Sequence, residues 1–361
     1  MHKKKLIAGA LPSVICVSLL FMFGIMMMIE LCLNSGRMIA RAEDYEQGRA
    51  SLHAFRLRYM LDTTINLTNE YKQYELSDKL DLSVHASISK HGLYDKVSLK
   101  YDLATGGSLV YTGLAGVIGT PYDCGVIVPS DDGIVTLSDT CSFESTVMFP
   151  RGLYRINRYN DDSLVVLKAP SRMPPLTEET YRTADSVLNR AYLADSVCLT
   201  DADSIPDRLI AARYVYVDST FNSSVQIFAT DSVTVDSGAC LQYPSGIYGY
   251  SETCSVKVKC DSRIDGYVIM PSTSAQICDS ISYVQESGSV VRGLIYIDGK
   301  AQVSGVVSGT LFVRLPVKEF QQGEMRWAFS KFHQVANYVT AIPNVFNHHK
   351  RHMIIKKYEI D

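Results

Sequence analysis

Acidic side chains are the residues of this sequence most able to do chemistry, and several occur in pairs or in Asp-Ser steps. Adjacent pairs stand at Asp131-Asp132 and Asp161-Asp162. Asp-Ser steps, each followed by Val or Ile, begin at Asp185, Asp195, Asp203, Asp231 and Asp279. Paired carboxylates are what glycoside hydrolysis requires. Asp and Ser also hydrogen-bond chain corners, and this turn chemistry explains both patterns better than catalysis does.

Other catalytic signals are absent from the sequence. No histidine occurs between His91 and His333, and there is no Gly-x-Ser-x-Gly, phosphate-binding glycine loop or His-Glu-x-x-His. We therefore predict that the chain is not an enzyme, and we assign no catalytic, cofactor-binding or metal-ligating residue. Because β-helices also house polysaccharide lyases and hydrolases, a glycan-cleaving or glycan-binding protein stays the alternative. Tyrosines that could contact sugars are Tyr243, Tyr248, Tyr250, Tyr267, Tyr283 and Tyr296, and strand packing is their simpler role.

Cysteine usage does not indicate a metal site. Cys16 and Cys32 lie in or near an apolar run, and seven more follow at 124, 141, 198, 240, 254, 260 and 278, with no CxxC or zinc spacing. We expect most to be small buried hydrophobes; Cys254 and Cys260 are the pair closest to a disulfide spacing. The tail NHHKRHMIIKKYEID could hold a metal or touch anionic lipid, and a solvated tail is the simpler interpretation.

The beginning of the chain predicts a membrane anchor. Residues 1–5 carry three lysines, and residues 6–29 carry no charge, enough for a helix to cross the hydrocarbon core. A cleaved signal peptide is the alternative, with Ala40-Arg41-Ala42 as its small-x-small site, but the run is too long and too distant. Lysines before the span place the N-terminus in the cytoplasm. We expect a single-pass inner-membrane protein whose C-terminal domain is periplasmic.

Residues 30–50 continue as a charged helical stalk, and residues 51–125 alternate apolar and polar positions as an antiparallel sheet with one wet face does. The long N-terminal helix is similar to that of pilins, but a processing Gly at position 9 would require Glu at Val14, so pilin-type processing is not supported. Thr177 followed by Glu178 and Glu179 predicts a helix over 177–193.

One octet pattern occurs twice, as FESTVMFP over 143–150 and as IDGYVIMP over 264–271. The apolar-x-Gly-x-apolar opening of the second octet, IDGYV, returns at 291–295, 303–307 and 307–311. Short strands that end at small residues and follow so closely predict a coil of stacked rungs, in which each rung shares its core with the next. We therefore expect a mainly β chain whose residues 126–316 form a right-handed parallel β-helix, or solenoid. A β-sandwich with hairpins is the alternative.

Residues 317–361 complete the prediction as a capping helix and a basic tail. The segment GEMRWAFSKFHQVANYVTAI places on one helical stripe, which ends before Pro343, the residues Met325, Ala328 or Phe329, Phe332, Val335 or Ala336, and Val339.

A family resemblance rests on Phe228-Ala229-Thr230-Asp231-Ser232 and Tyr243-Pro244-Ser245, together with FESTVMFP and the x-Gly-x rungs. Over about residues 130–315 the chain resembles uncharacterised single-span envelope proteins of the Bacteroidota that carry a β-solenoid ectodomain, and its rungs look like those of bactofilins. The resemblance implies a helix-anchored solenoid and no assigned activity.

With 35 basic and 38 acidic residues, no nucleic-acid partner is indicated. We expect a membrane-anchored structural or scaffold protein of the envelope, in contact with lipid through residues 6–29, that binds a protein partner or itself; a glycan ligand is possible.

Overall fold

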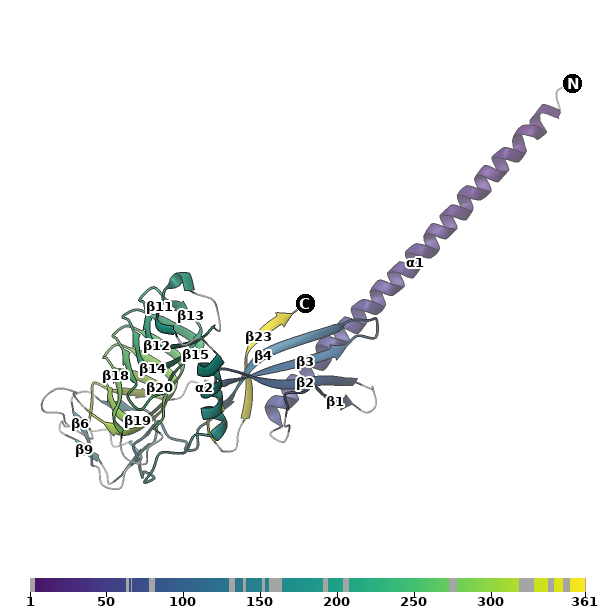
Figure 1. Cartoon of the computed structure of the whole chain (residues 1–361). Coiled ribbons are helices and arrows are strands. Elements are labelled where there is room, and N and C mark those ends of the chain that lie inside the picture. Colours follow the sequence, from purple (N-terminus) through teal and green to yellow (C-terminus); the bar gives the residue numbers. More distant parts are fainter. Residues whose placement is uncertain are drawn as a thin grey trace.

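The computed structural model of the chain is mainly β, with one long N-terminal helix (Figure 1). It describes residues 4–62, 65, 67–77, 82–129, 134–138, 141–150, 153–155, 164–190, 194–203, 208–272, 278–317, 328–336, 341–346 and 351–360.

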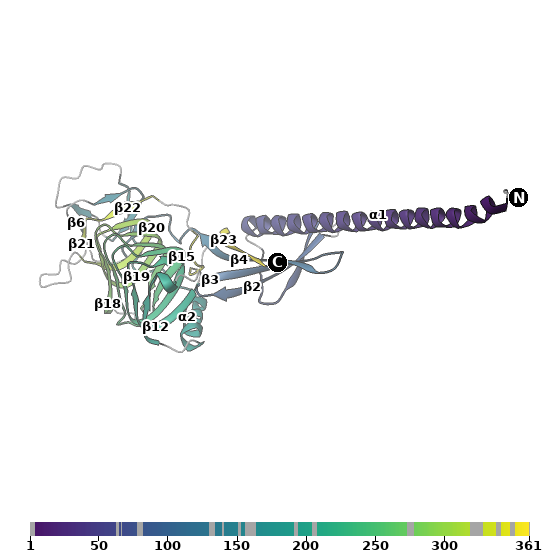
Figure 2. The same cartoon turned by 90° about the horizontal axis from the view of Figure 1, so that it is seen from above.

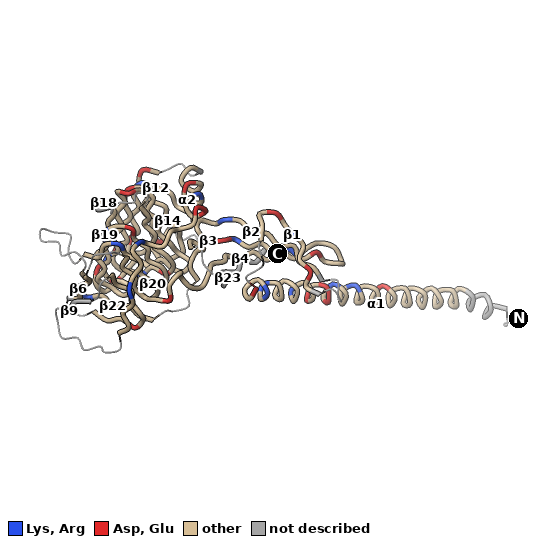
Figure 3. The backbone as a smooth tube through the Cα atoms, turned by 90° about the horizontal axis from the view of Figure 1, so that it is seen from below, with Lys and Arg blue, Asp and Glu red and all other residues tan. Residues whose placement is uncertain are grey.

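Helix α1 (Lys4–Leu61) contains the predicted span and stalk in one unbroken run of 58 residues. It is long and apolar enough to cross a membrane, and none of its apolar window is buried by the rest of the chain. The helix projects from the β regions (Figure 2), and in its coloured part the charged residues follow the apolar stretch (Figure 3). The stalk was expected to end near residue 50. The helix instead continues through Gly48 to Leu61. Gly48 is where the helix comes closest to the antiparallel sheet, since a Cβ there would lie 2.7 Å from Leu109 and 2.8 Å from Tyr101.

The last turns of α1 pack on an antiparallel sheet. Its strands, in spatial order, are β1 (Lys72–Ser77), β2 (Leu82–His91), β3 (Tyr94–Asp102), β4 (Ser108–Ile118) and β23 (Arg351–Ile360). Leu52, Phe55 and Tyr59 of the helix share a buried cluster with Val97 and Leu99 of β3. The expected antiparallel sheet is therefore present, and the basic tail, expected to be solvated, supplies its last strand.

A second sheet, in its described residues, contains only parallel pairs and encloses one core. Its main order is β10-β8-β5-β20-β19-β17-β15-β14-β12-β11. The strands are β5 (Val126–Ile127), β7 (Ser142–Phe143), β8 (Val147–Phe149), β10 (Val166–Lys168), β11 (Ala194–Leu199), β12 (Arg208–Val217), β13 (Asn222–Ser223), β14 (Val225–Val235), β15 (Cys240–Gly249), β16 (Ser255–Val258), β17 (Arg263–Met270), β18 (Cys278–Gln285), β19 (Val290–Val303), β20 (Val306–Pro316) and β22 (His333–Val335). A small parallel sheet, β21 (Ala328–Ser330), β6 (Val135–Ser138) and β9 (Leu153–Arg155), lies at one end.

Parallel pairing runs in three rows around that core. The first row joins the starts of β12 and β14, the ends of β15 and β17, the middle of β19, and β20, β5, β8 and β10. The second row joins β11, the ends of β12 and β14, β16, β18 and the end of β19. The third row joins β13 and β7 through the starts of β15, β17, β19 and β20 and through β22. Each row turns alternate side chains inward, as Val268, Val256 and Ile264 show, and all of these belong to one buried cluster. That these rows form a right-handed solenoid stays a prediction.

The two octets occupy equivalent positions in this register. In the third row, pairing passes from Ile264 through Val291, Val307 and Gln334 to Phe143. In the first row, pairing connects Val268 in the same way with Val147. The repeated pattern therefore marks residues that do the same packing in different turns of the chain.

Glycines of the x-Gly-x motifs stack on one another at a single corner. Gly266, Gly293 and Gly309 pair in register and have φ of +144°, +121° and +144°. A Cβ on Gly293 would lie 2.0 Å from the carbonyl oxygen of Gly266. Only glycine fits a corner where the φ is positive and the next backbone is this close.

Stacking order does not follow chain order. Strands β5, β7, β8 and β10 lie beyond β20 and β22, at the end of the sheet opposite β11. Between β10 and β11, helix α2 (Glu178–Arg190) runs along the outside of the first row, within the range predicted for a helix; the backbone N–H of Thr180 donates to Thr177 Oγ1 at 3.3 Å, as an N-cap requires. Ala184 of α2 packs with Phe228, Tyr248 and other residues in a second buried cluster.

The predicted capping helix is wrong over its described part. Residues 328–336 contain β21 and β22, separated by Lys331 with φ +52°. Phe329 and Phe332 stack at 5.1 Å, and Phe332 meets Phe143 at 5.6 Å inside the core. The apolar spacing that suggested a helix also suits two strands joined by a turn. Met325 and Val339 lie outside the described residues.

Candidate interaction surface

No residue was predicted as a catalytic or ligand site, and of the described acids singled out in the sequence only Asp195 and Asp231 come together, around Arg213. Asp131-Asp132 and Asp161-Asp162 lie outside the described residues, as do the side chains of Asp203 and Asp279. Asp185 of α2 accepts a hydrogen bond from the Tyr250 hydroxyl at 2.6 Å. Asp195 and Asp231 both face Arg213.

The outward side of the second row is a polar surface, which we call the polar face. Its outward residues alternate with buried ones such as Val215, Val233 and Val256. They form two columns across the strands: Ser196, Tyr214, Ser232, Ser255, Ser282 and Lys300 in one, and Cys198, Tyr216, Thr234, Lys257, Val284 and Gln302 in the other. The buried contacts of α2 lie on the first row and not on this face. Most residues in the two columns carry a hydroxyl group.

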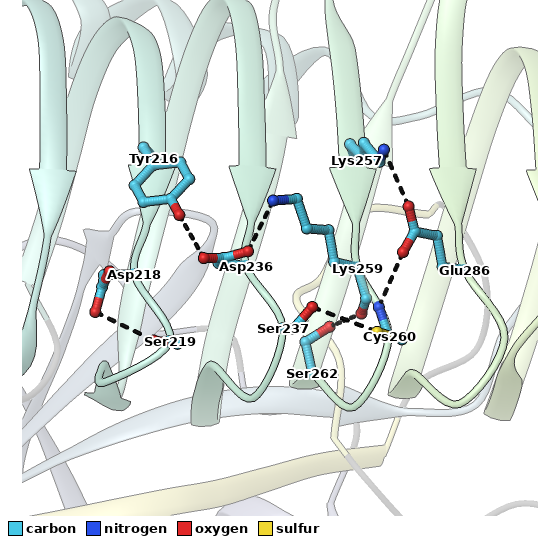
Figure 4. A network of polar contacts seen from close by, with 10 residues as sticks. All are labelled: Tyr216, Asp218, Ser219, Asp236, Ser237, Lys257, Lys259, Cys260, Ser262 and Glu286. Atoms are coloured by element: carbon cyan, nitrogen blue, oxygen red, sulfur yellow. Dashed lines mark hydrogen bonds and ion pairs between the residues drawn. The ribbon is translucent and has the colours of Figure 1, made fainter.

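Charged residues tie successive turns together at the edge of the polar face (Figure 4). The backbone N–H groups of Asp236, Lys259 and Glu286 donate to the strand one turn earlier, which stacks these residues at one corner. Lys259 Nζ lies 2.8 Å from Asp236 Oδ1, and Tyr216 donates its hydroxyl hydrogen to the same carboxylate. Lys257 Nζ lies 3.0 Å from Glu286 Oε1.

Hydrogen bonding fixes the protonation of this corner. The hydrogen bonds from Lys259 and Tyr216 hold the pKa of Asp236 down to about 2. The bond to Asp236 raises the pKa of the Lys259 ammonium and of the Tyr216 hydroxyl. A general acid or base needs a pKa near the working pH. These three shifts all move away from neutrality, so the trio is suited to holding strands together rather than to proton transfer.

A second charged group lies at the β11 end of the polar face. Arg213 Nε is 3.2 Å from Asp231 Oδ2, Arg213 Nη1 is 3.7 Å from Asp195 Oδ1, and the guanidinium lies 5.3 Å from the Tyr214 ring centre. Opposite charges thus bridge β11, β12 and β14, while Tyr214 stays 44% exposed. The face ends in an accessible aromatic ring beside a cation.

One Ser–His contact has the residue types of a nucleophile and its base. Ser142 Oγ lies 2.8 Å from His333 Nδ1, on neighbouring strands β7 and β22. A working pair needs a third group that orients the base. Among the described residues no carboxylate forms a hydrogen bond or ion pair with His333, so the contact is a cross-strand bond. The described residues also contain no group of three His, Cys, Asp or Glu that could hold a metal ion.

The expectation that most cysteines are buried is wrong for the described residues: Cys124, Cys141 and Cys254 are buried, Cys240 and Cys260 are half-buried, and Cys16, Cys32 and Cys198 are exposed. Among the tyrosines named in the sequence, Tyr250 is also exposed. Tyr248, Tyr267, Tyr283 and Tyr296 are buried, as the packing interpretation predicted. Cys254 and Cys260 flank β16 and are both free, and Cys254 is buried. Cys260 Sγ lies 3.3 Å from Ser237 Oγ instead. The lysines and Tyr216 of the polar face were not identified from sequence, although Lys257 and Lys259 alternate with buried valines in CSVKVKC.

No family model, curated protein or solved structure matches the chain.

Proposed function

We propose that the chain is a membrane-anchored, non-enzymatic scaffold of the cell envelope, a subunit of an envelope or surface-appendage assembly. Residues 6–29 lie in the inner membrane, and the domain that follows is periplasmic. We interpret the wound parallel sheet as a β-solenoid, because successive turns pair in register and share one core. The resemblance to helix-anchored Bacteroidota envelope proteins supports the same location.

The observation that carries this proposal is the rigid joint between the anchored sheet and the parallel sheet. Gln226 of β14 is 1% exposed; its Oε1 accepts hydrogen bonds from Leu93 N at 3.0 Å and from Tyr267 Oη at 2.8 Å. Its Nε2 donates to the carbonyl of His91 at 2.9 Å. One buried amide therefore fastens the β2–β3 hairpin to two turns of the parallel sheet.

Aromatic and ionic contacts extend the joint. The rings of Tyr94 and Tyr267 meet edge-on at 5.7 Å between centres. Lys90 Nζ lies 2.6 Å from Asp95 Oδ1 and 3.1 Å from Glu179 Oε1, so one cation links the hairpin to α2. A buried joint of this kind restrains rotation of one sheet relative to the other, which a flexible linker would allow. It suits a protein that holds a surface at a fixed place above the membrane.

Crosslinking in intact cells tests the scaffold proposal. A photoreactive amino acid replaces Thr234 in the polar face, and Ser98 of β3 is the matched control position; both are half-buried on a strand. The Thr234 probe is expected to give discrete adducts with a protein, identified by mass spectrometry, at several times the yield from Ser98. Adducts from neither position, or equal yields from both, would argue against a scaffold that acts through the polar face.

A glycan-binding or glycan-cleaving role is the second candidate, and the hydroxyl columns of the polar face favour its binding form. Ser232, Ser255 and Ser282 repeat at the strand spacing, and Tyr214 offers a ring on which a sugar could stack. A rise in thermal stability with soluble wall sugars, lost in Tyr214→Ala, would favour this role over the scaffold.

A further inference from the structure

Part of α1 stands free of both the predicted span and the rest of the protein. The span ends at residue 29, and the first buried helix residue beyond it is Asp44, whose Oδ2 accepts hydrogen bonds from Thr105 N and Thr105 Oγ1, both at 2.8 Å. From there Gly48, Leu52 and Phe55 continue the contact with the antiparallel sheet. Residues 30–43 are exposed along their whole length.

This free segment is amphipathic. One side, which we call the stalk stripe, carries only apolar or small residues: Met28, Leu31, Cys32, Ser35, Met38, Ile39 and Ala42. Leu31 is 66% exposed, Met38 72% and Ile39 60%. Glu30, Asn34, Arg37 and Arg41 lie on the other side with Asp44. Ala42 and Asp44 are about 200° apart around the axis, so the stripe faces away from the sheet.

Lipid does not cover the outer half of the stalk stripe when residues 6–29 fill the bilayer. Met38 lies nine residues beyond Ile29, about 14 Å along the axis, past the headgroup layer. Exposed apolar side chains that form a continuous stripe on a helix in water indicate a protein partner.

Spacing and charge identify the partner as a second copy. The stripe advances as 28, 31/32, 35, 38/39 and 42, a period of about 3.5 residues, which is that of a left-handed coiled coil. The membrane holds every copy in the same orientation, so two helices meet in parallel and each residue faces its own counterpart. A charge on the stripe would then face itself, and the stripe has none; Ser35 and Ala42 allow close approach.

We propose that residues 28–42 of α1 pair with the same segment of a second copy as a parallel two-stranded coil that continues out of the bilayer. The pairing places two ectodomains side by side on one stalk and doubles the polar face. This inference rests on the membrane insertion that is part of the proposed function.

Cys32 lies on the stripe and provides the test, in the full-length protein in native membranes. Cys16→Ala removes the other thiol of α1, and mild oxidation is followed by non-reducing electrophoresis. We expect most of the chain to form a reducible dimer that Cys32→Ser abolishes. In the Cys16→Ala, Cys32→Ser background, Leu33→Cys introduces a thiol about 160° around the axis from Ser35, the centre of the stripe, and should crosslink at least several-fold less. Met38→Glu should reduce the Cys32 dimer by a similar factor.

Equal crosslinking at positions 32 and 33, or no dimer through Cys32, would overturn the pairing. An adduct of Cys32 with a different protein would overturn it too, because the partner would then not be a second copy. Alkaline extraction of the same membranes separates this failure from failure of the anchor. A chain that stays in the pellet without a Cys32 dimer refutes the pairing alone, whereas a chain that is extracted refutes the anchor.

Discussion

Replacing Gly293 by alanine should destabilise the parallel sheet strongly. At φ +121° an L-residue costs about 1–2 kcal/mol. The added Cβ would also lie 2.0 Å from the carbonyl oxygen of Gly266, which is backbone and cannot rotate away. Relieving such an overlap by shifting packed strands costs about 1–3 kcal/mol more. The sum, about 2–5 kcal/mol, is a large share of the roughly 5–15 kcal/mol that stabilises a typical domain.

Gly238 provides the matched control, because its φ is +85° but the nearest atom to an added Cβ, Ser219 O, is 3.9 Å away. Gly238→Ala should lose only the conformational part, about 1–2 kcal/mol. Pulse proteolysis of the full-length protein in detergent, across a urea series, measures both free energies of unfolding. Equal losses in the two variants would refute the explanation by close backbone approach.

Three further changes test other parts of the structure. Gln226→Ala leaves Leu93 N and Tyr267 Oη without their buried acceptor and should cost about 2–4 kcal/mol in the same assay, whereas the exposed Gln242→Ala should cost almost nothing. Because the folded pKa of Asp236 is about 2, below its ordinary value of 3.8, its stabilisation is full above about pH 4 and is lost as the pH falls towards 2; the stability difference between wild type and Asp236→Asn should shrink over that interval, and a constant difference would contradict the assignment. Phe332→Ala should cost about 3–5 kcal/mol if its ring fills the core beside Phe143; a loss below 1 kcal/mol would contradict that placement.

Local sequence patterns predicted the structure correctly where the same packing position recurs from strand to strand. The octets and the x-Gly-x motifs predicted equivalent strands, and the register from Ile264 to Phe143 contains that equivalence. The N-cap at Thr177 likewise predicted a helix that is present. Both signals arise from contacts that recur in every turn or lie within a few residues.

Long-range pairing was beyond such patterns. The residues near 351 do not indicate that the tail pairs as β23 with β4, more than 200 positions earlier. Backbone hydrogen bonds of an edge strand do not require a particular local sequence. The segment 328–336 failed for a different reason: Phe329 and Phe332 suit one face of a helix as well as two short strands. The polar face was not recognised because its residues come together only when strands from 194 to 302 stack.

The order of stacking affects how the chain can fold as it is made. Strands β5 and β7 are synthesised early, yet their neighbours in the sheet, β20 and β22, come roughly 180 residues later. At about 5–20 residues per second, those early edges wait many seconds for their neighbours. An incomplete chain therefore offers bare strand edges that attract other chains. We therefore expect the edges of β5 and β7 to stay exposed to other chains until β20 and β22, in the last third of the polypeptide, have been synthesised.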